Sequence, residues 1–312
     1  MDLTILERRS ELLAAARQFF WQRNFVEVET PLLSSEVIPE LHIEPLAAKA
    51  HNEDQESWLQ ASPELHMKRV LAGGAKAVFQ ITRSFRGGER GALHHPEFTI
   101  VEWYRVGDDD QAGIQLLDQF CQSLLGTAPA TLTSYGEAFQ KRVAICPHTS
   151  TAEELAACAR KFQLVIPDGF PKHDRDEWLN LLLTTLIEPN LGRELPVILY
   201  DYPATQAALA KTSTRKDGIE VARRFELYWR GVELANGYDE LTDAEKLRSR
   251  LERVNQQRSA DGRAALPLPT SLLDAMRSSL PACSGCALGF DRLVMLATGA
   301  KSIAEVMACP EA

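Results

Sequence analysis

The spacing of apolar and polar residues predicts that helices and paired strands are mixed along the chain. Residues 3–23 carry apolar side chains near the 3.6-residue period of an amphipathic helix, and a short strand is expected at 25–28, before Pro31. From 77 to 86 the pattern changes to strict alternation, which is typical of a strand with one apolar and one polar face. A second strand is expected at 97–104. The segment GGERGALHH between these strands includes three glycines and predicts a mobile hairpin loop.

The remaining pattern completes an α+β fold, in which helices flank a mainly antiparallel sheet. The expected helices lie at 112–125, 151–164, 174–188, 243–258 and 291–298. The expected strands lie at 196–200 and 284–290, with a hairpin at 225–234 that turns near Arg230-Gly231. Segments 126–150 and 258–270 are predicted to be rich in loops, but neither marks a second core. We therefore expect a single domain over residues 1–312.

The composition is that of an ordinary globular protein. The chain has 312 residues, 45% hydrophobic and 25% charged, which is enough to fold without disulfides or a structural metal. Its net charge of −9 argues against nucleic-acid binding by phosphate neutralisation, but not against a local site for a phosphorylated small molecule. Its apolar runs are too short for a membrane span, and the charged N-terminal segment predicts neither signal nor transit peptide. Six scattered cysteines indicate reduced thiols, so we expect a cytoplasmic protein.

Two glutamates, Glu226 and Glu233, give the strongest local signal. In a hairpin turning at 229–230 they would lie directly opposite each other on one face, where like charges are destabilising. A facing pair is tolerated when one carboxyl is protonated or when a divalent cation lies between them. Oxygen ligands favour magnesium that is shared with substrate phosphates. Two solvated glutamates on an edge hairpin are the alternative interpretation.

A glycine-rich loop gives a second signal, in the segment SFRGGERGALHHPEF. Arg86 lies on the polar face of its strand, where a guanidinium can bind a phosphate through two hydrogen bonds. Phe98, on the returning strand, is placed to stack on a base. The alternative is an ordinary hairpin with a surface arginine.

A third signal is the segment SGCALGFDRL. Gly289 ends a strand, and Arg292 follows in the first turn of the next helix. Helix N-termini favour anions, and a guanidinium there can also stack on a planar base. The segment matches neither the dinucleotide-binding pattern nor the P-loop.

A set of acidic residues would suit a cationic amine substrate. It comprises Glu64, Glu102 and Glu240, together with Tyr104. Taken alone, each is more often a solvated acid. The two cysteines at 283 and 286 have no second pair at zinc spacing and predict no metal site.

These segments occur in an order that resembles the catalytic domain of class II aminoacyl-tRNA synthetases, in particular the lysyl-tRNA synthetases. FVEVETP is similar to motif 1, SFRGGERGALHHPEFTIVEWY to motif 2 and GCALGFDRLVML to motif 3. FELYWRGVELANGYDEL is similar to the lysine-type active-site hairpin. The resemblance covers roughly residues 10–310, and four ordered motifs rarely match by chance.

Two departures narrow the resemblance. The chain starts about one helix before motif 1, so we expect no anticodon-binding domain, and Ala287 stands where motif 3 has its middle glycine. Both features are similar to shortened paralogues that attach (R)-β-lysine to a lysine of translation elongation factor P. The resemblance therefore implies activation of lysine or β-lysine with ATP and Mg²⁺, and elongation factor P rather than tRNA as acceptor. Motif 1, around Pro31, implies a homodimer, and nothing implies a membrane.

The resemblance also implies a role for each residue at a matching position. Its catalytic residues are Arg86 and Arg292, and its magnesium ligands are Glu226 and Glu233. Its substrate-binding residues are Ser62, Glu64, Glu102, Tyr104, Asn236, Glu240 and Ala287. Its ATP-binding residues are Arg86, Gly87, Gly88, Glu89, His95, Phe98, Glu233, Leu234, Gly289 and Arg292.

The loop of motif 2 departs from the family at three positions. Gly88 replaces a glutamate, Ala92 replaces a frequent arginine, and His95 replaces an asparagine. Either Glu89 takes over the adenine contact, or the loop has shifted.

Ala287 and the acceptor leave alternatives open. We hypothesise that the Ala287 methyl disfavours α-lysine and leaves the longer β-amino acid accepted. One alternative is activation of α-lysine or another amino acid for a different acceptor, tRNA included. Another is a catalytically inactive synthetase-like regulatory subunit, and a third is a structural α+β domain that has no active site.

Overall fold

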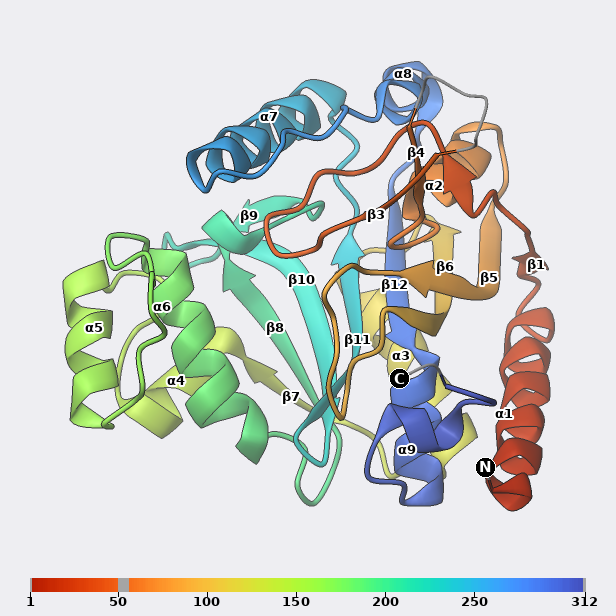
Figure 1. The fold of residues 1–312 in the computed structure, drawn as a ribbon, viewed down its shortest axis with the longest axis horizontal. Helices are drawn as coiled ribbons and strands as arrows, with labels where there is room; N and C mark the ends of the chain where they lie inside the picture. The colour runs from red at the N-terminus through yellow and green to blue at the C-terminus, as the bar shows by residue number, and fades with distance from the viewer. Residues whose placement is uncertain (1, 50–55, 311–312) are drawn as a thin grey trace.

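A nine-stranded mixed sheet lies at the centre of the computed structural model, which describes residues 2–49 and 56–310 (Figure 1). Its strands follow the order β1-β5-β6-β12-β11-β10-β8-β7, with β9 paired to β10 beside this path. The pairs are antiparallel except at the two edges, where β1 pairs with β5 and β7 with β8 in parallel. The α+β fold on a mainly antiparallel sheet is therefore confirmed. The strands are Val26–Glu27 (β1), Ala77–Phe85 (β5), Glu97–Val106 (β6), Thr131–Ser134 (β7), Val197–Pro203 (β8), Thr212–Thr214 (β9), Glu220–Trp229 (β10), Val232–Asp239 (β11) and Cys283–Gly289 (β12).

Three helices cover one face of the sheet: α1 (Leu3–Trp21), α3 (Asp110–Leu125) and α9 (Phe290–Thr298). The strands turn alternate side chains toward them, and Phe79 and Trp103 are fully buried there in the largest apolar core. This is the apolar face that the alternation along β5 predicted. The polar face of the same strands is left for the opposite side of the sheet.

Two groups of helices pack at the two ends of that opposite side. At one end lie α2 (Glu64–Ala72), α7 (Ala244–Ala260) and α8 (Thr270–Ser279), next to a small sheet of β2 (Leu33–Ser34), β4 (Ser57–Leu59) and β3 (Leu46–Ala48). At the other end α4 (Tyr135–Val143), α5 (Ala152–Lys161) and α6 (Arg175–Leu182) pack over β8. Figure 1 shows the two groups on either side of β10 and β11. Within the described ranges, no helix is both long and apolar enough to cross a bilayer.

Some short elements lie where the sequence pattern predicted loops or nothing. Strand β7 and helix α4 fall inside 126–150, and α8 follows the predicted loop at 258–270. Helix α4 begins with a capping box, in which Ser134 and Glu137 bond each other's backbone N–H groups. Its buried residues Tyr135 and Phe139 pack in the apolar cluster over β8. A nine-residue helix depends on such tertiary packing more than on its own periodicity.

Candidate active site

A cavity of about 820 Å³ lies over the middle of the sheet, between the two groups of helices. Strands β6, β11 and β12, the loop after β5, and helices α2, α6 and α7 all contribute to its wall. The predicted site residues that line it are Ser62, Glu64, Arg86, Glu89, His95, Phe98, Glu102, Tyr104, Glu233, Leu234, Asn236, Glu240, Ala287, Gly289 and Arg292. Of the predicted residues, Gly87, Gly88 and Glu226 lie outside the lining. Residues far apart in the sequence thus meet in one space.

One end of the cavity is rich in carboxylates. Glu102 accepts a hydrogen bond from the Ser62 hydroxyl at 2.7 Å and one from the Tyr104 hydroxyl at 2.6 Å. Both Glu102 and Glu240 are only 1% exposed, and Glu64 lies beside them. Burial and the charge of Glu64 raise the pKa of Glu102 to about 7. This end therefore favours a bound cation, which would restore the ionised carboxylates.

Lys68 lies behind two of these carboxylates and was not predicted. Its Nζ is 2.5 Å from Glu64 Oε1 and 2.6 Å from Glu240 Oε2. Burial raises the pKa of Glu240 to about 8, although Lys68 acts against that shift. The four-residue spacing of Glu64 and Lys68 on α2 was a signal for half of this contact. The other half depends on tertiary structure.

Small residues of β12 form the floor. A Cβ at Gly285 would lie 2.2 Å from the Tyr104 ring and 2.4 Å from Glu240 Oε1, so glycine is needed for these side chains to approach. Ala287 pairs with Glu102 on β6 and with Asn236 on β11. At Gly289 a Cβ would meet the Arg292 side chain at an ordinary 3.6 Å. No side chain of the described residues therefore crowds Gly289, and its backbone is open to the cavity.

The other end of the cavity carries arginines. The Arg86 guanidinium carbon lies 5.0 Å from the centre of the Phe98 ring, and its Nη1 is 3.8 Å from Glu89. Its buried Nε has no hydrogen-bond partner within the described residues. Arg86 therefore keeps a donor available for an anionic ligand.

Arg292 joins the loop of motif 2 to the sheet. It donates to the carbonyl oxygens of Leu93 at 3.1 Å and Glu233 at 3.0 Å. Its Nη2 lies 2.9 Å from His94 Nε2. Burial and the charge of Arg292 lower the pKa of His94, which keeps the imidazole neutral as an acceptor. The guanidinium is thus held at the cavity wall by backbone groups.

The hairpin of β10 and β11 turns at Arg230-Gly231, as predicted. Both residues have positive φ, +54° and +77°, which is typical of a two-residue turn of type I′. The prediction that Glu226 and Glu233 lie directly opposite each other is wrong. Glu226 pairs with Asn236 and Glu233 with Tyr228. The turn lies one residue later than the 229–230 on which this prediction rests, and a bulge between Leu227 and Tyr228 shifts the register by one further residue.

Glu226 is buried and bound by its neighbours, so the alternative of a solvated glutamate on an edge hairpin is also wrong. It is 4% exposed on an interior strand and bonds Arg224, Tyr202 (2.5 Å) and Tyr228. The Tyr228 hydroxyl oxygen also lies 3.1 Å from Glu188 Oε1.

Mutual repulsion marks these acids as a place for a cation. Burial and the charges of Glu226 and Glu233 raise the pKa of Glu188 to about 7, and burial and Glu226 raise the pKa of Glu233. Within the described residues, no group of three His, Cys, Asp or Glu side chains is arranged to hold a metal. A magnesium ion here would need further oxygens from a substrate phosphate or water, as magnesium commonly does.

The loop of motif 2 is anchored at its start and end. The Gly87 N–H donates to the carbonyl of Glu44 at 2.7 Å, and Gly88 follows with φ +77°. At the far end His95 Nδ1 lies 2.7 Å from the carbonyl oxygen of Glu97. Glu89 and His95 face the cavity between these anchors.

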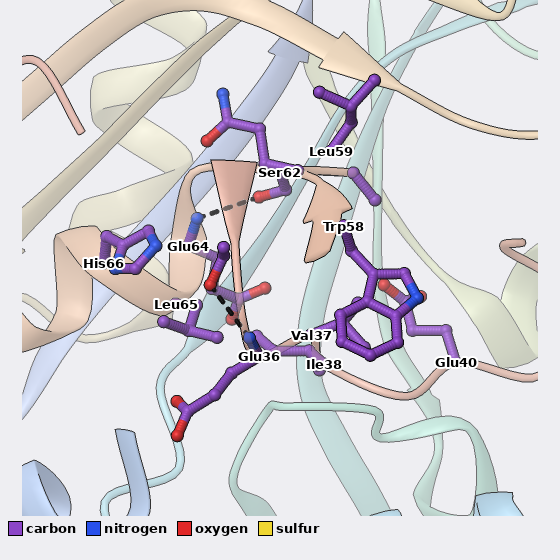
Figure 2. A pocket seen from close by; sticks show the side chains of 13 residues that line it. Glu36, Val37, Ile38, Glu40, Trp58, Leu59, Ser62, Glu64, Leu65 and His66 are labelled. Atoms are coloured by element: carbon purple, nitrogen blue, oxygen red, sulfur yellow. Dashed lines mark hydrogen bonds between the residues drawn. The ribbon is translucent and has the colours of Figure 1, made fainter. Parts of the chain in front are cut away.

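A second, much smaller cavity of about 40 Å³ adjoins the carboxylate end (Figure 2). It is bounded by β4 and the start of α2, where the Ser62 hydroxyl accepts from the Glu64 N–H at 3.1 Å. Ser62 therefore bonds Glu64 and Glu102 at once and fixes their spacing. The space is too small for an amino acid.

Residues 3–312 match the family model described as tRNA synthetases class II (D, K and N). The chain is 44% identical over 308 residues to the elongation factor P–(R)-β-lysine ligase of Salmonella paratyphi B, covering 97% of this chain and 94% of the relative. The same values hold for the proteins of that name from Salmonella schwarzengrund and Salmonella choleraesuis. Since the family model spans nearly the whole sequence and these relatives match it over nearly their whole length, the chain belongs to the class II tRNA synthetases of the D, K and N group.

Proposed function

We propose that the protein activates (R)-β-lysine with ATP as an aminoacyl-adenylate and transfers it to a lysine side chain of translation elongation factor P. The observation that carries this proposal is the single cavity with a carboxylate-rich end and an arginine-bearing end. One end suits ammonium groups and the other suits phosphates. The names of the relatives, which match nearly the whole chain, give independent support.

The carboxylate end binds the two ammonium groups of the substrate. Glu64, Glu102 and Glu240 accept from them, while Ser62, Tyr104 and Asn236 complete the same wall. Each charge-assisted hydrogen bond to a buried group contributes about 1.5–3 kcal/mol. The substrate carboxylate then points along β12 toward Arg86.

The arginine end binds ATP. Phe98 and Arg292 stack on the adenine. The nucleotide is surrounded by the side chains of Glu89 and His95 and by the backbone at 87–88, Leu234 and Gly289. Glu226 and Glu233 would hold Mg²⁺, which would neutralise charge on the triphosphate. Arg86 holds the α-phosphate beside the substrate carboxylate.

Adenylate formation needs orientation more than proton transfer. A carboxylate oxygen attacks the α-phosphorus in line, the bond to the β-phosphate oxygen breaks, and pyrophosphate leaves. No general base is required, because the carboxylate is already a nucleophile. Arg86 lowers the barrier by holding two anions together and by stabilising the charge of the transition state.

Transfer completes the reaction. The ε-amine of the acceptor lysine attacks the adenylate carbonyl, AMP leaves with the bonding electrons, and the new amide nitrogen releases a proton. An acceptor protein of this kind and the use of ATP support a cytoplasmic location.

An exposed apolar surface supports a homodimer through motif 1. Trp21, Val26 and Leu33 are each at least half exposed, along the end of α1 and the strands that follow it. Burying such side chains against a second copy is favourable. Sedimentation at micromolar concentration is expected to give twice the chain mass, and Val26→Asp to give the monomer.

The test of the function measures both half-reactions. ATP–pyrophosphate exchange is compared with (R)-β-lysine and α-lysine, and transfer to purified elongation factor P is then followed by mass. We expect exchange with β-lysine and a mass increase of one β-lysyl group. Preferred exchange with α-lysine and charging of purified tRNA would favour the tRNA alternative. Absence of exchange with either amino acid would favour an inactive regulatory subunit.

A further inference from the structure

We propose that Lys68 is a positioning residue that sets the charge of the recognition pocket and so its selectivity for a substrate with two ammonium groups. The proposal rests on the proposed function and adds to it a residue that does not touch the substrate. Its basis is the placement of one buried cation behind two of three buried carboxylates.

The contacts show that Lys68 acts from behind the cavity wall. Its ammonium lies within 2.6 Å of both Glu64 and Glu240, and its side chain is only 2% exposed. Glu64 and Glu240 line the cavity, whereas Lys68 is not among the described residues that do. Lys68 therefore acts on a ligand through the two carboxylates that it holds.

The net charge of the pocket explains why this placement would favour a substrate with two ammonium groups. The three carboxylates of Glu64, Glu102 and Glu240 with the one ammonium of Lys68 leave two negative charges. Two substrate ammonium groups balance them, and the substrate carboxylate is balanced separately by Arg86. A substrate with one ammonium group leaves a buried carboxylate without a partner, which is costly.

The groups that face Lys68 are acidic or uncharged. Glu64 faces it from α2, Glu240 from the segment after β11, and Tyr104 of β6 lies with its ring centre 5.9 Å from the ammonium. Cys283 of β12 and Glu102 of β6 lie close enough to interact electrostatically. Removing Lys68 would therefore leave Glu64 and Glu240 without the internal cation that they share.

The test compares Lys68→Met with the double variant Lys68→Met/Glu240→Gln. The single change leaves three carboxylates with no internal cation, whereas the double change restores two net negative charges. In pyrophosphate exchange at pH 7, we expect Lys68→Met to raise KM for β-lysine about 30-fold or more, with kcat and KM for ATP within threefold. We expect the double variant to recover at least fivefold of that loss.

A further variant separates charge from structure. Lys68→Arg should retain most of the preference for β-lysine over norleucine, which lacks the second ammonium group. The exposed Lys76→Met serves as control and should behave as the parent protein.

Several outcomes would overturn the proposal. KM of Lys68→Met within twofold of the parent, or a double variant worse than the single one, would show that Lys68 does not set the pocket charge. If Lys68→Met does not fold, the double variant and Lys68→Arg carry the test, and loss of the β-lysine preference in both would contradict it. If the parent protein activates no diammonium amino acid at all, the proposed function fails instead.

Discussion

The two ends of the cavity differ in how far their side chains are already arranged. At the carboxylate end Glu102 and Glu240 are 1% exposed and bonded to fixed neighbours. At the arginine end Arg86 and Arg292 are partly exposed, and groups of the chain itself occupy several of their donors. The amino acid thus binds a preformed site. At the other end, Arg86 and Arg292 must give up contacts within the chain before they can bind the nucleotide. Selectivity resides in the first end and charge stabilisation in the second.

Removal of the cation at the arginine end is expected to have the largest effect on activity. Arg86→Gln is expected to lower kcat for pyrophosphate exchange about 10³-fold, because one guanidinium holds both reacting anions. The matched control is Arg83→Gln on strand β5, three residues before Arg86, where the side chain is exposed. A loss confined to KM, with kcat unchanged, would show that Arg86 only binds substrate.

The carboxylate end is tested by Glu102→Gln, which keeps shape and removes charge. We expect KM for β-lysine to rise about 10- to 100-fold, in line with ~1.5–3 kcal/mol for a charge-assisted hydrogen bond. KM for ATP should stay within twofold, because the two ends are separate. Equal increases in the KM values for β-lysine and ATP would show that the two ends do not bind the two substrates separately.

The pH dependence of KM for β-lysine tests the carboxylate end without a mutation. Because the pKa of Glu102 is raised to about 7, its carboxyl is largely protonated below pH 7 and must ionise to bind an ammonium group. KM for β-lysine should therefore fall as pH rises from 6 to 8, by up to about tenfold per unit below the pKa. In Glu102→Gln this dependence around pH 7 should shrink, and an unchanged slope would assign it to another group.

The smallest expected effect is at Ala287, between the two ends. Ala287→Gly removes one methyl beside Glu102 and Asn236. We expect the ratio of α-lysine to β-lysine activation to rise about tenfold, within the ~1–3 kcal/mol that one methylene confers. The measurement is kcat/KM for both amino acids in pyrophosphate exchange, and an unchanged ratio would refute the hypothesis.

Much of the fold followed from alternation and turn chemistry. The predicted strand at 97–104 is present as β6, in which Glu102 and Tyr104 lie on one face, opposite the core that contains Trp103. The positive φ of Arg230 and Gly231 suits the predicted turn. The predicted facing of Glu226 and Glu233 was wrong, because a turn one residue later places Tyr228 opposite Glu233. A bulge, which leaves no mark in the polar pattern, then moves Glu226 one residue further out of register.

Site residues could be predicted where the residue type within a motif indicated the role. They could not be predicted where the role depends on contact between two segments distant in the sequence. Lys68 was missed because a lysine on a short helix normally reaches solvent, and its burial depends on Glu240 far along the chain. Gly285 was overlooked for the same reason. Only the positions of Tyr104 and Glu240 show that a side chain there would collide.

The buried Lys68 constrains how this pocket could acquire a new specificity. Exchanging Glu240 for a neutral residue to admit a neutral amino acid would leave an ammonium ion with half of its compensation in a place that water does not reach. Replacing Lys68 alone would leave the carboxylates of Glu64 and Glu240 without their shared cation. A route from a dicationic to a monocationic substrate therefore passes through paired changes at positions 68 and 240, and single steps along it carry a fitness penalty.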